Sequence, residues 1–245
     1  MKVLVTGAKG FVGRNLVSQL RNIQSGKVKN YALSGNELVI FEYDVDSAPS
    51  ELDDYCRQAD FILNLAGVNR PLDQSEFMKG NFGFASVLLA SLKRHGNTCP
   101  IMISSSTQAA LDNPYGASKR AGEQLLLEYS RETGAKVLIY RFPNVFGKWC
   151  RPNYNSAVAT FCHNITHGLD IQVNDRSVVM NLVYIDDVVN ELIAALTGDE
   201  NRVGEYCAVP TVHTITLGEI VDLLYTFQSS RVNLTVPNVG NAFEK

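Results

Sequence analysis

The sequence has few of the residues that secretion, metal chemistry or a membrane span would require. It contains only four histidines and one tryptophan, and its five cysteines are scattered and never form a C-x-x-C pair. An odd set of unpaired cysteines fits a reducing cytoplasm better than a disulfide-stapled secreted protein. The longest uncharged stretches, such as 152–169, are rich in Asn, Thr and His and are too polar to cross a bilayer. We therefore expect a cytoplasmic protein with no membrane partner.

Charge is also scarce and balanced. Only 19% of the 245 residues are charged, with 22 Lys and Arg against 25 Asp and Glu, for a formal net charge of -3. The chain thus lacks the concentrated basic face that sequence-independent nucleic-acid binding needs. Its 45% hydrophobic content excludes intrinsic disorder and suits one globular domain with a small lobe attached. Because residues 1–7 already form a strand and turn, no signal peptide is expected.

Short apolar runs alternate with longer amphipathic segments, a pattern typical of repeated βαβ units. Runs such as Val3-Leu4-Val5 and Phe61-Ile62-Leu63 are continuously apolar, as buried parallel strands are. The pattern predicts an α/β fold with a doubly wound parallel sheet, an NAD(P)-binding Rossmann fold, over residues 1–145. We expect strands near 2–6, 38–43, 60–65, 99–105 and 135–140, and helices near 11–22, 50–58, 73–94 and 115–133.

The composition shifts after Pro143 toward Gly, Pro and Asn. We interpret residues 146–245 as mostly a small C-terminal substrate-binding lobe, interleaved with the core. It should contain helices near 154–167, 186–196 and 217–229 and a strand near 178–184.

Gly7, Gly10 and Gly13 follow the first predicted strand and open the first helix. In a dinucleotide-binding turn the first glycine permits the tight turn, the second lets the backbone approach a pyrophosphate, and the third lets the helix pack on the sheet. The helix N-terminus adds free N–H groups for the anion. We therefore predict a cofactor site that also includes Phe11 and Val12; a tight turn without a ligand is the alternative.

The charges near this loop point to two different cofactors. Lys9 is placed for the 2′-phosphate of NADP(H), whereas Asp44 or Glu42, near the end of the second strand, could hold the free 2′-hydroxyl of NAD(H). We favour NADP(H) and keep NAD(H) as possible.

Tyr115 and Lys119 are four residues apart at the start of a predicted helix, which puts both on one helix face. A phenol is a poor acid at neutral pH, but an adjacent ammonium stabilises its anion and lowers its pKa. Ser104, Ser105 and Ser106 end a predicted strand, where side chains face the cofactor crevice. We choose Ser106, the outermost, to hold a substrate oxygen beside Tyr115. The alternative is that these residues only cap a loop and cover a solvated helix face.

Together these residues resemble the extended short-chain dehydrogenase/reductases, which act on nucleotide sugars. The resemblance rests on Gly7 to Gly13, Asn64-Leu65-Ala66-Gly67, Ser106, Tyr115-x-x-x-Lys119 and Arg141 to Gly147. Within that family the chain is similar to reductases of bacterial capsular-polysaccharide synthesis, in residues 65–71, 112–116, 146–150, 152–156 and 171–176.

The resemblance implies reduction of the C4 ketone of a UDP-4-keto-6-deoxy-N-acetylhexosamine, with Tyr115 as proton donor. It also implies that Leu65, Ala66 and Gly67 contact the cofactor, as do Tyr115 and Lys119, and that Asn81 holds a proton-relaying water. It further implies a homodimer, and a cupin epimerase domain that in the capsular relatives follows the reductase and is not in this chain.

Nucleotide-sugar contacts are expected where Lys or Arg can meet a diphosphate and amides can meet a uracil edge. The predicted substrate-binding residues are Asn69, Arg70, Asn144, Lys148, Asn155 and Arg176.

Other chemistries fit less well. His163 and His167 lie beside Cys162 at helical spacing but have no third ligand in view, so we predict no metal site. A nucleotide-sugar epimerase with tightly bound NAD stays open as an alternative. A non-enzymatic dinucleotide sensor or scaffold also stays open, although it would have no use for Ser106, Tyr115 and Lys119.

Overall fold

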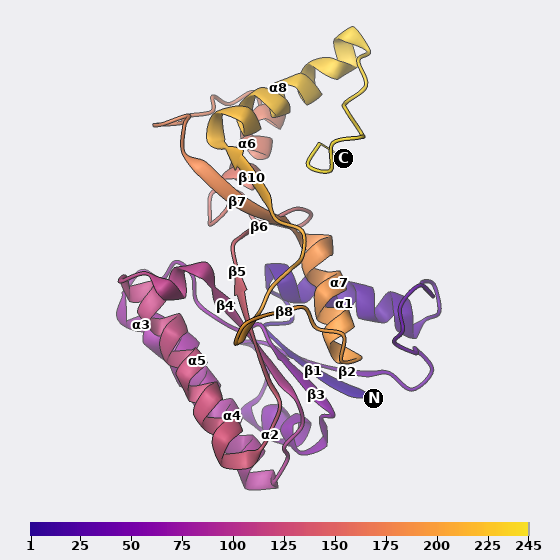
Figure 1. Ribbon diagram of the computed structural model, residues 1–245, viewed down its shortest axis with the longest axis vertical. Coiled ribbons are helices and arrows are strands. Elements are labelled where there is room, and N and C mark those ends of the chain that lie inside the picture. Colours follow the sequence, from indigo (N-terminus) through magenta and orange to yellow (C-terminus); the bar gives the residue numbers. More distant parts are fainter. Residues whose placement is uncertain (245) are drawn as a thin grey trace. The chain divides into compact units, whose positions relative to one another are not determined.

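The computed structural model in Figure 1 describes residues 1–244, which form two compact units. The first unit contains residues 1–143 and 185–210, and the second contains 144–184 and the chain from Thr211 on. The chain therefore leaves the first unit at Pro143 and returns to it for 26 residues (185 to 210).

The first unit is built on a seven-stranded sheet with the order β2-β1-β3-β4-β5-β9-β8. Its strands are β1 (Lys2–Thr6), β2 (Val39–Tyr43), β3 (Phe61–Asn64), β4 (Ile101–Ser106), β5 (Val137–Phe142), β8 (Arg202–Val203) and β9 (Tyr206–Cys207). All neighbours pair in parallel except β8 and β9. The strand order reverses direction between β1 and β3, which in open α/β sheets marks the crevice where ligands bind.

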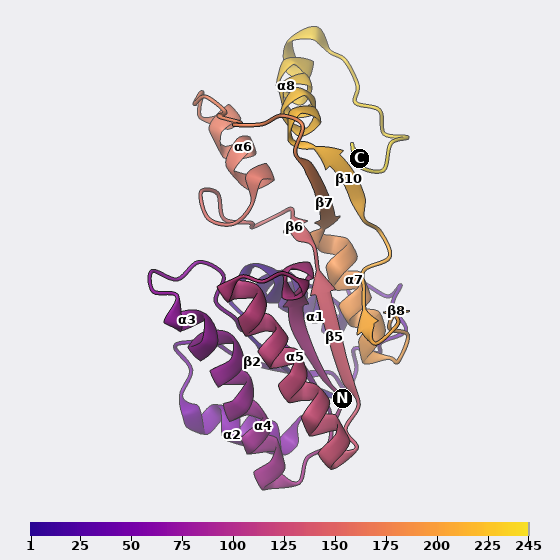
Figure 2. The same cartoon turned by 60° about the vertical axis from the view of Figure 1, so that its left-hand side comes forward.

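Helices cover both faces of this sheet (Figures 1 and 2). One face carries α1 (Phe11–Gln24) packed against α7 (Ile185–Leu196). The other carries α2 (Pro49–Gln58), α4 (Phe84–His95) and α5 (Pro114–Thr133). Strands and helices enclose a core of fully buried side chains such as Leu4, Ile62, Leu88 and Leu126. The doubly wound α/β prediction is confirmed.

The second unit has its own small sheet, with the order β10-β7-β6. The strands are β6 (Asn144–Phe146), β7 (Val179–Tyr184) and β10 (His213–Thr216), and the helices are α6 (Ala157–Thr166) and α8 (Leu217–Asn233). Phe161 of α6 packs with Leu182 of β7 and with Ile220 and Val221 of α8. The unit thus buries a separate apolar cluster.

Three features differ from the sequence-based expectation. The helix near 186–196 was expected in the lobe but lies in the first unit, because its apolar face, including Val188 and Leu192, is buried there. The helix expected over 73–94 is divided into α3 (Ser75–Phe77), the π-helix η1 (Met78–Gly83) and α4. Strands β6, β8, β9 and β10 were not expected, since two to four residues carry too little periodicity to indicate a strand.

No helix within residues 1–244 combines the length and the apolar character that crossing a bilayer would need.

Candidate functional site

The glycine loop is packed so closely that side chains would not fit. A Cβ on Gly7, whose φ is +66°, would lie 2.7 Å from the Ala66 amide nitrogen, and a Cβ on Gly13 would lie 2.1 Å from the Gly7 carbonyl oxygen. Helix α1 starts after Gly10, with no side-chain cap and no acidic residue in its first turn, which holds Phe11 and Val12. The free amides and positive dipole end are thus left for an anion. This cradle fits the pyrophosphate of a dinucleotide cofactor.

Both charges that bear on cofactor choice lie beside this loop. The Asp44 carboxylate accepts a hydrogen bond from the Lys9 backbone N–H at 2.7 Å. The Lys9 ammonium is exposed and pairs with Asp46, and this hydrogen bond raises the pKa of Lys9. Lys9 is therefore charged but already has an acidic partner.

Residues 65–67 connect the glycine loop to the candidate catalytic side chains. Gly7 packs against the backbone of Leu65 and Ala66, and a Cβ on Gly67 would lie 2.7 Å from Asn81 Oδ1 and 3.1 Å from Lys119 Nζ. The three predicted cofactor contacts after β3 therefore run from the pyrophosphate cradle to Lys119.

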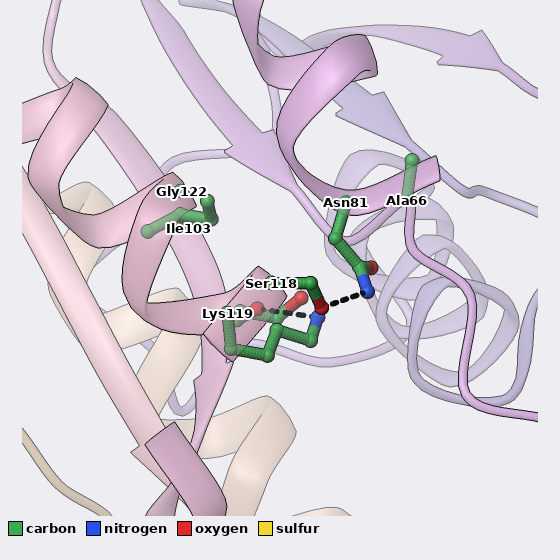
Figure 3. A pocket seen from close by; sticks show the side chains of 7 residues that line it. Ala66, Asn81, Ile103, Ser118, Lys119 and Gly122 are labelled. Carbon is green, nitrogen blue, oxygen red and sulfur yellow. Dashed lines mark hydrogen bonds between the residues drawn. The ribbon is translucent and has the colours of Figure 1, made fainter. Parts of the chain in front are cut away.

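Tyr115 and Lys119 lie on the first turns of α5. The helix begins sharply because Asn113 accepts a hydrogen bond from the Gly116 N–H and Pro114 occupies the first turn. Lys119 Nζ lies 5.7 Å from the centroid of the Tyr115 ring and donates to the Ser104 carbonyl at 3.1 Å. Figure 3 shows the Lys119 side chain in its pocket. Phe77 packs against the Tyr115 ring, with centroids 5.6 Å apart. The tyrosine ring is therefore held between an aromatic ring and an ammonium group.

Burial tunes the charge of Lys119. It lowers the pKa of Lys119 to about 8, while the nearby charge of Glu123 acts in the opposite direction. A lysine with a pKa in this range can change its protonation state near neutral pH, which is common in active sites and rare elsewhere.

The three serines at the end of β4 have different partners. Ser105 donates its hydroxyl to the buried Glu123 carboxylate. Ser106 accepts a hydrogen bond from the Gln108 N–H at 3.2 Å, and among residues 1–244 its hydroxyl proton has no acceptor. The hydroxyl proton of Ser106 is therefore available to a ligand oxygen, whereas that of Ser105 is not.

The Asn81 side chain bridges two segments of the candidate site. Its amide donates to the Val68 carbonyl at 3.1 Å and to Ser118 Oγ at 2.9 Å, and its oxygen accepts from the Val68 N–H at 2.9 Å. Figure 3 shows Asn81 and Ser118 pointing toward one another. Both N–H donors are thus used, and the side chain ties the loop after β3 to α5; a relay water would have to donate to the Asn81 oxygen.

The predicted substrate-binding residues are divided between the two units, and all are exposed. Asn69 and Arg70 follow the cofactor segment in the first unit. In the second unit, Arg176 pairs with Asp222 at 2.7 Å and donates to the Gly218 carbonyl at 3.1 Å. The others in this unit are Asn144, Lys148 and Asn155.

Sequence reasoning missed the polar residues behind the site, namely Ser118, Glu123 and Arg141 as a supporting set. The one available signal was spacing, since Glu123 lies one helical turn after Lys119.

The rings of His163 and His167 lie 4.1 Å apart between centroids. Within the described chain, no three His, Cys, Asp or Glu side chains are grouped so that they could hold a metal ion.

Fold and site together define a doubly wound dinucleotide-binding protein with a serine, a tyrosine and a lysine beside the cofactor cradle. The sequence profile of the NAD dependent epimerase/dehydratase family matches residues 3–208. The chain belongs to this family, which confirms the extended short-chain dehydrogenase/reductase prediction.

Its relatives include sugar-nucleotide enzymes. The chain is 43% identical, over all 245 of its residues and 62% of the relative's length, to a UDP-2-acetamido-2,6-beta-L-arabino-hexul-4-ose reductase from Pseudomonas aeruginosa. It is 28% identical to UDP-glucuronate 4-epimerase 6 of Arabidopsis thaliana, over 83% of this chain and 53% of the relative.

Among solved structures, the capsular polysaccharide assembling protein CapF from Staphylococcus aureus superposes with a TM-score of 0.87 at 47% identity, over 100% of this chain and 63% of CapF. A UDP-glucuronic acid 4-epimerase from Bacillus cereus in complex with NAD shares the fold, with a TM-score of 0.75 at 21% identity, over 94% of this chain and 85% of the epimerase. The chain thus spans less than two thirds of the length of the reductase and of CapF.

Proposed function

We propose that this chain reduces the C4 ketone of a UDP-4-keto-6-deoxy-N-acetylhexosamine with NAD(P)H, in the synthesis of a capsular or surface polysaccharide precursor. The observation that carries the proposal is the placement of Lys119 beside Tyr115, with the unused hydroxyl proton of Ser106 on the neighbouring strand. The reductase from Pseudomonas aeruginosa supports the substrate class, because it aligns along the whole of this chain.

In this mechanism the chain supplies a proton donor and an oxyanion partner. A nicotinamide cofactor held at the Gly7–Gly13 loop would supply the hydride for C4. Tyr115 gives its proton to the oxygen on C4, and Ser106 donates a hydrogen bond to the same oxygen as negative charge develops there. The Lys119 ammonium stabilises the tyrosinate that remains, and it is placed to hold the cofactor ribose.

The cofactor proposal is NADPH in preference to NADH, with Lys9 as partner of the 2′-phosphate. Lys9 is exposed and its ammonium can leave Asp46 for a doubly charged phosphate, because a surface ion pair is weak. Asp44, at the same loop, supports NADH instead. The two residues give the choice of cofactor a direct test.

Three further parts of the proposal come from the family resemblance and, for the location, from the scattered cysteines. The chain works as a homodimer through the helices of segments 73–94 and 115–133, it acts in the cytoplasm, and its substrate is prepared by a cupin epimerase domain. The residues proposed to contact the nucleotide sugar are Asn69 and Arg70 in the first unit and Asn144, Lys148, Asn155 and Arg176 in the second.

The main rival is a nucleotide-sugar epimerase that keeps its NAD tightly bound. The plant epimerases are 26–28% identical to this chain, against 43% for the reductase. A purified protein that carries stoichiometric oxidised cofactor would favour the epimerase. A non-enzymatic sensor would not need the Ser106, Tyr115 and Lys119 arrangement.

The test is to incubate the protein with candidate UDP-4-keto sugars and either reduced cofactor, and to follow cofactor oxidation by absorbance and the sugar by NMR. We expect stoichiometric oxidation and reduction with at least one N-acetylated 4-keto sugar. The control is Tyr115→Phe, which keeps the ring and loses the proton donor, so it should bind cofactor normally and show no turnover. A Tyr115→Phe variant with most of the activity would rule out the assignment.

A further inference from the structure

An ion pair with a buried carboxylate and a half-buried guanidinium lies one helical turn beyond Lys119. Glu123 of α5 is 2% exposed, and Arg141 of β5 donates to both of its oxygens, from Nε at 2.8 Å and from Nη2 at 2.6 Å. The Tyr206 ring covers the guanidinium, with Arg141 Cζ 3.7 Å from the ring centroid. A pair of this kind is costly to desolvate and is weak evidence for stability, so its presence here calls for another explanation.

The pair is connected to the candidate site through the end of β4. Ser105 donates to Glu123, and its backbone register partner in β5 is Arg141. The preceding residue, Ser104, accepts the Lys119 hydrogen bond, and the following residue is Ser106. Glu123 therefore fixes the strand end that carries the candidate oxyanion donor to the helix that carries Tyr115 and Lys119.

The Glu123 carboxylate is the charge that favours the protonated form of Lys119 and so raises its pKa. Helix α5 contributes Tyr115 and Glu123, while β4 and η1 contribute only the neutral polar groups of Ser104 and Asn81. Glu76 of α3 and Lys79 of η1 are exposed, η2 (Thr107–Ala110) has no ionisable side chain, and Arg120 donates to the Ala109 carbonyl instead. A buried ammonium without a carboxylate nearby would lose its proton.

We propose that Glu123 and Arg141 are positioning residues that set the charge of the Tyr115–Lys119 pair: Glu123 keeps Lys119 protonated, and Arg141 limits the strength of that effect. The proposal rests on the proposed function only for the role of Lys119 in the reduction. The charge coupling itself is a property of the unliganded protein.

The two charge-removing variants should shift the Lys119 titration in opposite directions, which distinguishes this coupling from a merely structural cross-link. Removing the Glu123 charge leaves the Arg141 cation uncompensated and drives Lys119 toward its neutral form. Removing the Arg141 charge leaves Glu123 unopposed and favours the charged form. A structural role would make both variants less stable and would give no reason for their titrations to move apart.

The experiment follows the titration of Lys119 directly, by NMR of protein labelled with carbon-13 at lysine Cε, with the signal assigned by its loss in Lys119→Met. We expect Glu123→Gln to lower the titration midpoint by roughly one pH unit or more, Arg141→Gln to raise it, and the double variant to return toward the wild-type value. The same order should appear in the alkaline limb of the kcat/KM profile.

The matched control is Glu191→Gln. Glu191 is also a buried carboxylate, 6% exposed, but it lies in α7 and accepts hydrogen bonds from the Tyr140 hydroxyl and the Asn201 N–H, each at 2.7 Å. This variant should lower the melting temperature without moving the Lys119 titration.

The proposal is overturned if Glu123→Gln and Arg141→Gln leave the Lys119 midpoint unchanged or move it in the same direction. Should Glu123→Gln fail to fold, Arg141→Gln alone decides, since a midpoint that does not rise contradicts the coupling. A chain that titrates as expected but reduces no 4-keto sugar would contradict only the proposed function.

Discussion

Three consecutive serines show how strongly the role of a residue depends on its partner. The Ser104 carbonyl accepts a hydrogen bond from Lys119, and the Ser105 hydroxyl donates to Glu123. The Ser106 hydroxyl accepts from the Gln108 N–H, and its own proton is not donated to a described residue. Side chains alternate along a strand, so neighbouring hydroxyls meet different surroundings. This difference makes the choice of oxyanion donor testable.

We expect Ser106→Ala to lower kcat by roughly 100-fold or more, the usual effect of removing one oxyanion donor. Ser105→Ala should lower kcat less and should instead destabilise the fold, because it removes a partner of the buried Glu123 carboxylate. The measurements are steady-state kinetics and thermal unfolding. If Ser105→Ala lost more activity than Ser106→Ala at equal stability, Ser106 would be the wrong hydroxyl.

The proposed cofactor preference depends on two side chains: Lys9 favours NADPH and Asp44 favours NADH. We expect Lys9→Ala to raise the KM for NADPH more than the KM for NADH, because only NADPH has a 2′-phosphate that the Lys9 ammonium could bind. Asp46→Asn is the matched variant: it frees Lys9 from its surface partner and should lower the KM for NADPH. Equal effects of Lys9→Ala on both cofactors would move the preference to Asp44 and NADH.

At the scale of elements, the π-helix η1 places Asn81 where an uninterrupted α-helix would not. The extra residue in its turn brings Asn81 to the loop after β3, where its amide joins both backbone groups of Val68 to Ser118 of α5. Single π-turns inside helices often occur at functional sites. Here the turn holds the loop after β3 against α5.

Asn81→Ala should therefore destabilise the protein by about 1–3 kcal/mol, because it leaves buried polar groups without partners. It should also weaken cofactor binding while leaving the pH dependence of kcat unchanged. Ser118→Ala, which removes one of the three bonds, should have a smaller effect in the same direction. Denaturant unfolding and cofactor titration measure these effects, and a shifted pH profile for Asn81→Ala would restore the proton-relay role.

At the scale of the whole molecule, the question is which steps of the chemistry the two units perform. Epimerisation beside a ketone needs a base that removes a carbon-bound proton and an acid on the opposite face of the sugar. Tyr115 is placed for a proton on oxygen. We propose that this chain reduces a sugar that has already been epimerised.

We expect no enhanced exchange when an un-epimerised 4-keto sugar is supplied in deuterated water without reduced cofactor. NMR would follow solvent deuterium at C3 and C5, with a protein-free sample as reference. Incorporation above that reference would show that these two units enolise the substrate themselves, and the division of labour would have to be abandoned.

Local sequence determined the parts of this protein that depend on near neighbours. The glycine spacing, the Tyr115–Lys119 spacing and the five central strands were all predictable, because turns, helix faces and apolar runs are set within a few residues. Tertiary structure alone decided the rest: that Ser105 binds Glu123, that the Asn81 side chain ties the loop after β3 to α5, that α7 returns to the first unit, and that Arg141 meets Glu123 from 18 positions away. These outcomes depend on burial and on partners brought together by the fold, and a buried polar group takes whichever partner lies within hydrogen-bond distance, however distant it is along the chain.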